Sequence, residues 1–191
     1  MKATKNIPTK VAAKEVLVSK KPEMPSSWEF QQLAEACLDA ANAAYADCQR
    51  RDEDFAAGKH DGKFTFMAIT VAFLYLRSVE LALKAAIKER GLARAEAIPS
   101  RKLGHELKKL IECATTPMLS GPPAFTLSEL GMDQASQEFL ERYSDDYANK
   151  WLEYHFDPWT IPSLRESQRI ATSIIEAIKP FALTLYPFRP S

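Results

Sequence analysis

The stretch that decides the fold is FTFMAITVAFLYLRSVELALKAAIKERG, residues 64–91. Its first half, Phe64 to Leu76, is almost wholly apolar but shorter than the roughly 20 residues of a membrane-spanning helix. Gly91 is the residue type that most easily adopts the left-handed conformation at which helices end. We therefore expect one continuous helix. Its N-terminal half should be buried on all sides, either at the centre of a bundle or at a subunit interface.

A second long helix is predicted just before this stretch. Ser26 and Glu29 have the spacing of a capping box, which indicates a helix start, and the helix should run to Gly58. Spacings of three and four residues place one stripe of mostly small side chains on its inner face: Phe30, Ala34, Cys37, Ala41, Ala44 and Cys48. The turn at residues 59–62 would then join the two helices into a long antiparallel hairpin.

Shorter helices are expected after the hairpin. Residues 104–115 predict a third helix with an apolar side at Leu103, Leu107, Leu110 and Ile111. A capping box at Thr126 and Glu129 precedes a helical segment over 127–150, which we expect to be interrupted near Gly131 and Ser144.

The last helix should begin at a further capping-box spacing, Ser163 and Glu166, after an aromatic bend at 151–162. Pro180 should kink or end it, because proline removes a helical hydrogen bond. Its inner face carries a list of apolar side chains: Leu164, Ala171, Ile174, Ile175, Ile178 and Leu185. The predicted fold class is all-α, an antiparallel bundle of four to five helices with a long central helical hairpin.

Composition restricts the class of protein further. The 25 basic and 25 acidic residues cancel, which argues against general attraction to polyanions or anionic membranes. Six lysines lie within residues 1–25, which we interpret as a flexible basic tail ahead of a single domain at 26–188. The chain shows no signal-peptide or transit-peptide pattern. Three cysteines without CxxC spacing are typical of reduced thiols, so we expect a cytoplasmic protein without a membrane span.

One charged pattern interrupts the central apolar helix. Arg77, Glu80 and Lys84 are spaced by three and four residues, so they project from one side of that helix. Two interpretations stay open at this point. The residues form either a solvated edge stabilised by weak ion pairs or a polar groove closed by His105 from the next helix.

The same residues resemble a known family. Arg77-Ser-Val-Glu80-Leu-Ala-Leu-Lys84-Ala, followed after a connector by Leu103-Gly104-His105-Glu106-Leu107-Lys108-Lys109-Leu110, is similar to the Glu-x-x-x-Lys-Ala and Gly-His-x-Leu-x-x-Leu patterns of HEPN domains (higher eukaryotes and prokaryotes nucleotide-binding). The aromatic segment from Tyr143 to Phe156 resembles a strip that follows in many members. The resemblance covers about residues 30–185.

The resemblance implies a helical bundle that forms homodimers and is often encoded beside a nucleotidyltransferase or a defence partner. Active members are metal-independent ribonucleases that use an arginine, four to six intervening residues, and a histidine. Here only three residues separate Arg101 from His105, and the residue separated from His155 by four others is a lysine, Lys150. Lysine cannot hold a phosphate in bidentate fashion, so the resemblance favours a noncatalytic member.

We accordingly expect a domain that binds a partner protein or a nucleotide or RNA ligand, in a defence or toxin–antitoxin-like system. The candidate ligand-binding residues are Arg77, Glu80, Lys84, His105, Arg142 and His155. We expect no metal site, cofactor or catalytic residue, because the sequence has no phosphate-binding glycine loop and no zinc-ligand spacing. The alternatives are a ribonuclease with a shifted arginine and histidine constellation, and a purely structural adaptor.

Overall fold

The computed structural model describes residues 25–56, 64–93, 98, 104–117, 119, 121–149 and 161–182. The secondary structure of these residues is entirely helical, which confirms the all-α fold class. The elements are α1 (Ser27–Ala56), α2 (Phe64–Glu89), α3 (Leu107–Thr115), the 3-10 helix η2 (Ser128–Leu130), α4 (Gln134–Ala148) and α6 (Leu164–Ala182). The predicted tail up to residue 24, the turn at 59–62 and most of the aromatic bend lie outside the described residues.

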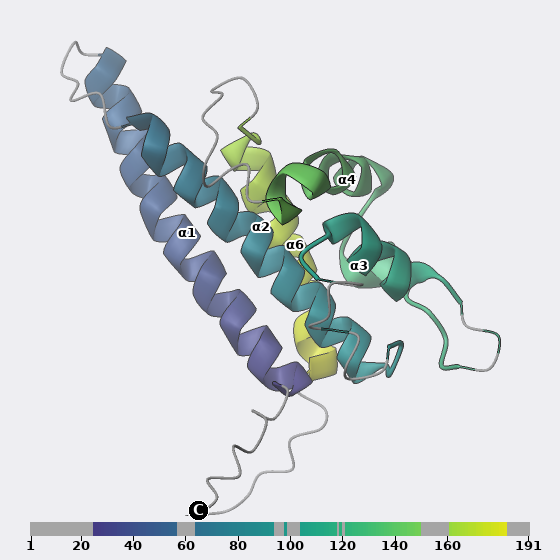
Figure 1. Ribbon diagram of the computed structural model, residues 1–191. Coiled ribbons are helices and arrows are strands. Elements are labelled where there is room, and N and C mark those ends of the chain that lie inside the picture. Colours follow the sequence, from purple (N-terminus) through teal and green to yellow (C-terminus); the bar gives the residue numbers. More distant parts are fainter. Residues whose placement is uncertain are drawn as a thin grey trace, which may run out of the picture.

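Helix α2 is the centre of the arrangement. Figure 1 shows α1 and α2 side by side and running in opposite directions, with α3 and α4 on the other side of α2. Helix α6 crosses behind and packs against both α1 and α2. Every other α-helix of the described chain therefore contacts α2.

The local signals for helix ends are confirmed. The Ser26 backbone N–H donates to Glu29 Oε2 at 2.6 Å, and the Glu29 N–H donates to Ser26 Oγ at 3.1 Å, which is the reciprocal bonding of a capping box. The same pair of bonds joins Thr126 and Glu129, where it opens η2. Gly91 adopts a φ of 64° directly after α2.

The buried part of α2 differs from the expectation. We predicted burial on all sides of the N-terminal half, in a bundle or at a subunit interface, and within the single chain its apolar side chains Met67, Ile69, Phe73 and Leu74 are only partly buried. Residues 78–87 are instead buried without interruption. The reason is coverage by neighbours, because α1, α3 and α6 surround this later part of the helix.

Three helix boundaries also differ from the expectation. Helix α3 begins at Leu107, so His105 lies in the turn before it. Helix α4 continues through Ser144, whereas the predicted break at Gly131 is present with a φ of 68°. Helix α6 includes Pro180 in its last turn and ends at Ala182.

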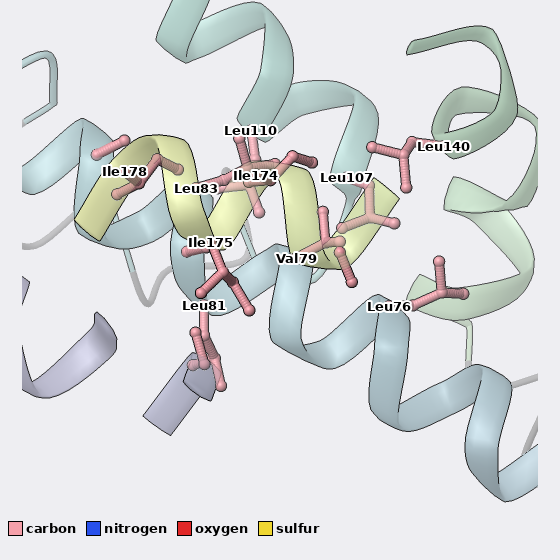
Figure 2. Packing of buried hydrophobic residues seen from close by; sticks show 14 of the residues in the cluster. Leu76, Val79, Leu81, Leu83, Leu107, Leu110, Leu140, Ile174, Ile175 and Ile178 are labelled. Atoms are coloured by element: carbon pink, nitrogen blue, oxygen red, sulfur yellow. The ribbon is translucent and has the colours of Figure 1, made fainter. Parts of the chain in front are cut away.

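The core lies between α2 and the helices around it. Figure 2 shows Leu76, Val79 and Leu83 of α2 near Leu107 and Leu110 of α3, Leu140 of α4, and the isoleucines of α6. The inner stripe of α1 is buried at Phe30, Ala34, Ala41 and Cys48, and its remaining members Cys37 and Ala44 pack against the core. Small side chains allow α1 and α2 to approach closely, as the sequence predicted.

Two contacts hold the segment before α4 in place. Gly131 lies so close to α6 that a Cβ atom there would be 2.3 Å from the Ser173 carbonyl oxygen, and the Ser173 hydroxyl donates to the Gly131 carbonyl at 2.6 Å. Just after α2, the Arg90 guanidinium stacks on the Phe125 ring at 3.6 Å and donates to Glu129 at 2.8 Å. We call Arg90, Phe125, Phe181 and Glu129 the Arg90 cluster.

Candidate functional site: the Glu80 cluster

The structure brings four of the predicted site residues together in the middle of α2. Glu80 is flanked by Arg77 one turn before it and Lys84 one turn after it, and His105 approaches from the turn before α3. Tyr147 of α4 completes the group. We call these five residues the Glu80 cluster.

The Glu80 carboxylate is the hub of this cluster. Arg77 Nη1 donates to both carboxylate oxygens at 2.7 Å, and Lys84 Nζ donates to Oε1 at 2.5 Å. The Tyr147 hydroxyl donates to Oε2. The Glu80 side chain is 0% exposed, so water cannot reach the carboxylate. These donors provide the hydrogen bonds that water would otherwise provide.

The electrostatics keep Glu80 ionised. Burial alone would raise the pKa of Glu80, but the positive charges of Lys84 and Arg77 and the hydrogen bonds around it bring the pKa below its ordinary value. Burial and the neighbouring carboxylate raise the pKa of Tyr147, so its hydroxyl stays a donor. The cluster is a desolvated anion surrounded by donors.

His105 uses one ring nitrogen on the cluster. Its Nδ1 lies 3.1 and 3.2 Å from the two Glu80 oxygens and 3.3 Å from Arg77 Nη1. An ionised carboxylate can only accept and the guanidinium can only donate, so Nδ1 bonds to Glu80 when it carries a proton and accepts from Arg77 when it does not. The other ring nitrogen, Nε2, is then available to a second molecule, since the side chain is 55% exposed.

The cluster has a buried side and an open side. Lys84 is 7% exposed, whereas Arg77 is 33% exposed and His105 lies at the surface. Arg77 contacts both Glu80 and His105 through Nη1. Two cationic side chains surround one carboxylate, which leaves one net positive charge even when His105 is neutral. An anion approaching from solvent would meet Arg77 and His105 first.

The interpretation of this ladder as a solvated edge is wrong for Glu80 and Lys84, which are buried. The remaining candidates are not part of the cluster. Arg142 is exposed on α4, and among the described residues no hydrogen bond or ion pair joins it to Glu80. His155 lies outside the described residues.

Tyr147 is the residue that the sequence analysis missed. It is remote from Glu80 along the chain, and no local spacing connects the two. A signal existed in its position, because Tyr147 shares the inner face of α4 with Leu140 and Ser144. A tyrosine on a buried face usually needs a hydrogen-bond partner for its hydroxyl, and Glu80 is that partner.

Other kinds of site are not found in the part of the chain that the structure describes. None of its helices is long and apolar enough to cross a membrane. Its histidines, cysteines and carboxylates form no group of three that could hold a metal ion. The fold and the cluster therefore define a helical-bundle protein built around a buried carboxylate with two bases at its open side.

No protein-family model, no curated protein sequence and no solved structure matches the chain.

Proposed function

We propose that the chain is a noncatalytic HEPN-like domain that binds the phosphate group of a nucleotide-type ligand at the open side of the Glu80 cluster. Arg77 supplies a planar pair of donors for the phosphate, and His105 supplies a further donor when Nε2 carries a proton. Glu80 orients both bases, and Lys84 balances its charge from the buried side. Nucleotide binding is also what the resemblance to HEPN domains implies.

One observation carries this proposal. The cluster buries its acid and leaves Arg77 and His105 accessible to solvent, whereas an ion pair that only stabilises a surface leaves both partners exposed. Arg77 and His105 come from different elements and meet at one carboxylate. Polar groups that converge at such a point are typical of binding sites.

The binding of nucleotides tests the proposal. Thermal shift and calorimetry with AMP, ATP, UMP and inorganic phosphate should show stabilisation of the wild-type chain, because a ligand that binds only the folded state raises Tm. Arg77→Lys keeps the positive charge but loses the planar pair of guanidinium donors. We expect the affinity for the ligand to fall roughly 10-fold or more, since hydrogen bonds to charged groups contribute about 1.5–3 kcal/mol. His105→Ala should weaken binding similarly.

Arg142→Ala is the matched control, because Arg142 is an exposed arginine outside the cluster. It should bind as the wild type does. If no ligand in the panel raises Tm, or if Arg142→Ala weakens binding as much as Arg77→Lys, the proposal is wrong.

A ribonuclease is the second candidate, and the proximity of Arg77 and His105 favours it. Their nitrogen atoms are 3.3 Å apart although no Arg-x4-6-His motif joins them in sequence. An arginine that holds a phosphate beside a histidine that moves a proton is the arrangement such an enzyme needs. Cleavage of RNA in the presence of EDTA that disappears in His105→Ala would replace the noncatalytic proposal with this one.

We also propose that the protein forms a homodimer through the N-terminal half of α2. A single chain leaves Met67, Ile69, Phe73 and Leu74 only partly buried in the apolar N-terminal half of this helix. Light scattering after size exclusion should give twice the mass of one chain, and Ile69→Glu should give a monomer. A nucleotidyltransferase partner, which the resemblance implies, would be tested by co-purification of the two proteins.

A further inference from the structure

Helix α4 directs two buried hydroxyl groups toward the Glu80 cluster. Ser144 and Tyr147 lie three residues apart and are both almost fully buried, so they share one face of the helix with Leu140. Each hydroxyl bonds to a different element of the candidate site.

Ser144 holds the turn that carries His105. Its Oγ accepts a hydrogen bond of 3.1 Å from the Lys108 backbone N–H in the first turn of α3. The N-cap residue of α3, Glu106, makes no side-chain cap bond of its own. A serine on another helix thus provides an acceptor of the kind that a capping side chain normally provides, and it does so directly after His105.

Tyr147 holds the other half of the site. Its hydroxyl bonds to the same Glu80 carboxylate that receives Arg77 and His105. The Phe73 ring packs against Tyr147 with 5.5 Å between ring centroids, which fixes the direction of the phenol. Loss of this hydroxyl would leave one carboxylate oxygen without its partner from α4.

We propose that Ser144 and Tyr147 are positioning residues, which set His105 and Arg77 relative to each other when α4 docks on α2 and α3. The effect on ligand binding rests on the proposed function, whereas the effect on the ring of His105 does not. Helix α4 then assembles the anion site without touching the ligand. The two residues act through His105, Glu80 and Arg77.

Two variants and two matched controls test this inference. Ser144→Ala and Tyr147→Phe each remove one hydroxyl from the contacts above. Ser136→Ala removes a buried hydroxyl from the same helix that bonds to Asp133 and Arg169 instead. Tyr143→Phe removes the hydroxyl of a tyrosine whose ring packs on Phe139. All four changes delete a single oxygen, so general effects of the deletion cancel in the comparison.

The first measurement needs no ligand. The ring nitrogen resonances of His105 are recorded by NMR and assigned with His105→Gln. Ser144→Ala and Tyr147→Phe should shift these resonances, and Ser136→Ala and Tyr143→Phe should leave them unchanged. Ser144→Thr keeps the Oγ atom and should restore the wild-type resonances, which separates a positioning effect from poor folding.

The second measurement is the calorimetric affinity for AMP. It should fall about tenfold in Ser144→Ala and Tyr147→Phe and stay unchanged in both controls. Unshifted resonances in the two test variants overturn the inference, and so do shifted resonances with unchanged AMP affinity. If the wild type binds no AMP or other phosphate compound, the proposed function fails, and the His105 resonances alone decide whether α4 positions the ring.

Discussion

Two clusters around arginine and glutamate lie on or beside the same helix, and they are built in opposite ways. In the Arg90 cluster the arginine is the less exposed partner, at 20%: it stacks on Phe125 and donates to the Pro123 and Ala124 carbonyls as well as to Glu129. Its glutamate is the exposed partner, at 41%. In the Glu80 cluster the glutamate is enclosed and the arginine reaches solvent.

The difference separates a structural role from a binding role. Protein acceptors and an aromatic ring occupy the guanidinium of Arg90, so it holds the loop before η2 against the end of α2. The guanidinium of Arg77 and the ring of His105 share a single carboxylate and face outward. An arginine whose donors bond to protein acceptors, such as Arg90, indicates a structural contact. Accessible basic side chains around a buried, fully hydrogen-bonded carboxylate indicate an anion site.

The largest expected effect comes from removing the buried acid. Glu80→Ala leaves Lys84 buried without its carboxylate partner and Tyr147 without its acceptor. Loss of one member of a buried ion pair costs about 3–5 kcal/mol of unfolding free energy, which urea denaturation would measure. Glu129→Ala, the exposed counterpart, should cost clearly less. Equal losses in the two variants would remove the distinction between the clusters.

The next largest loss of stability is expected at Gly131, which lies close against α6. Gly131→Ala places a Cβ atom 2.3 Å from the Ser173 carbonyl oxygen and 2.9 Å from Ala177 Cβ, at a φ of 68°. Gly91→Ala is the matched control, because Gly91 has a φ of 64° and no atom within 4 Å of a Cβ. Overpacking should make Gly131→Ala about 1–3 kcal/mol more costly than Gly91→Ala in urea denaturation. Similar costs would mean that α6 and η2 separate easily.

The two arginines should respond differently to lysine. Arg90→Lys loses the stacked guanidinium and its fork of donors, and we expect about 1–2 kcal/mol less unfolding free energy. Arg77→Lys keeps a cation near Glu80, and Lys84 still bonds to the carboxylate. The loss of unfolding free energy in Arg77→Lys should therefore be smaller. Urea denaturation of both variants provides the measurement. A larger loss for Arg77→Lys would show that Arg77 is mainly structural.

The smallest effect is a dependence on pH. Hydrogen bonds from the Thr126 backbone and from Arg90 lower the pKa of Glu129 from 4.5 to about 2. The ionised form therefore stabilises the fold above pH 4.5, and this contribution is lost as pH falls toward 2. Glu129→Gln should show a shallower fall of Tm over this range. An identical slope in both proteins would show that Glu129 does not contribute.

Features that depend on short sequence separations could be predicted. The capping boxes at Ser26 and Thr126 involve residues three positions apart, and the side chains of Arg77, Glu80 and Lys84 share a face at helical spacing. The approach of His105 from the next element was one of the two interpretations of this spacing, and its contacts with Glu80 confirm it. The ligand, the partner protein and the homodimer of this chain remain predictions.

Features that depend on which helices meet could not be predicted. The uninterrupted burial of residues 78–87 was not predicted, because hydrophobicity does not reveal which part of α2 the helices α3 and α6 cover. Ser144 was expected to interrupt a helix, since serine competes for backbone hydrogen bonds, but here its hydroxyl bonds to α3. Tyr147 was missed for the same reason, because only the docking of α4 brings it to Glu80.

The uninterrupted burial of residues 78–87 has a consequence for how this sequence can vary. Most amphipathic helices tolerate exchange on their solvent side and resist it on the inner side, which gives a periodic pattern of tolerance. In this part of α2 every position faces a neighbour, and Ala82, Ala85 and Ala86 are 0% exposed. A complete substitution scan should therefore find a contiguous intolerant block, in which even a single added methyl group is selected against.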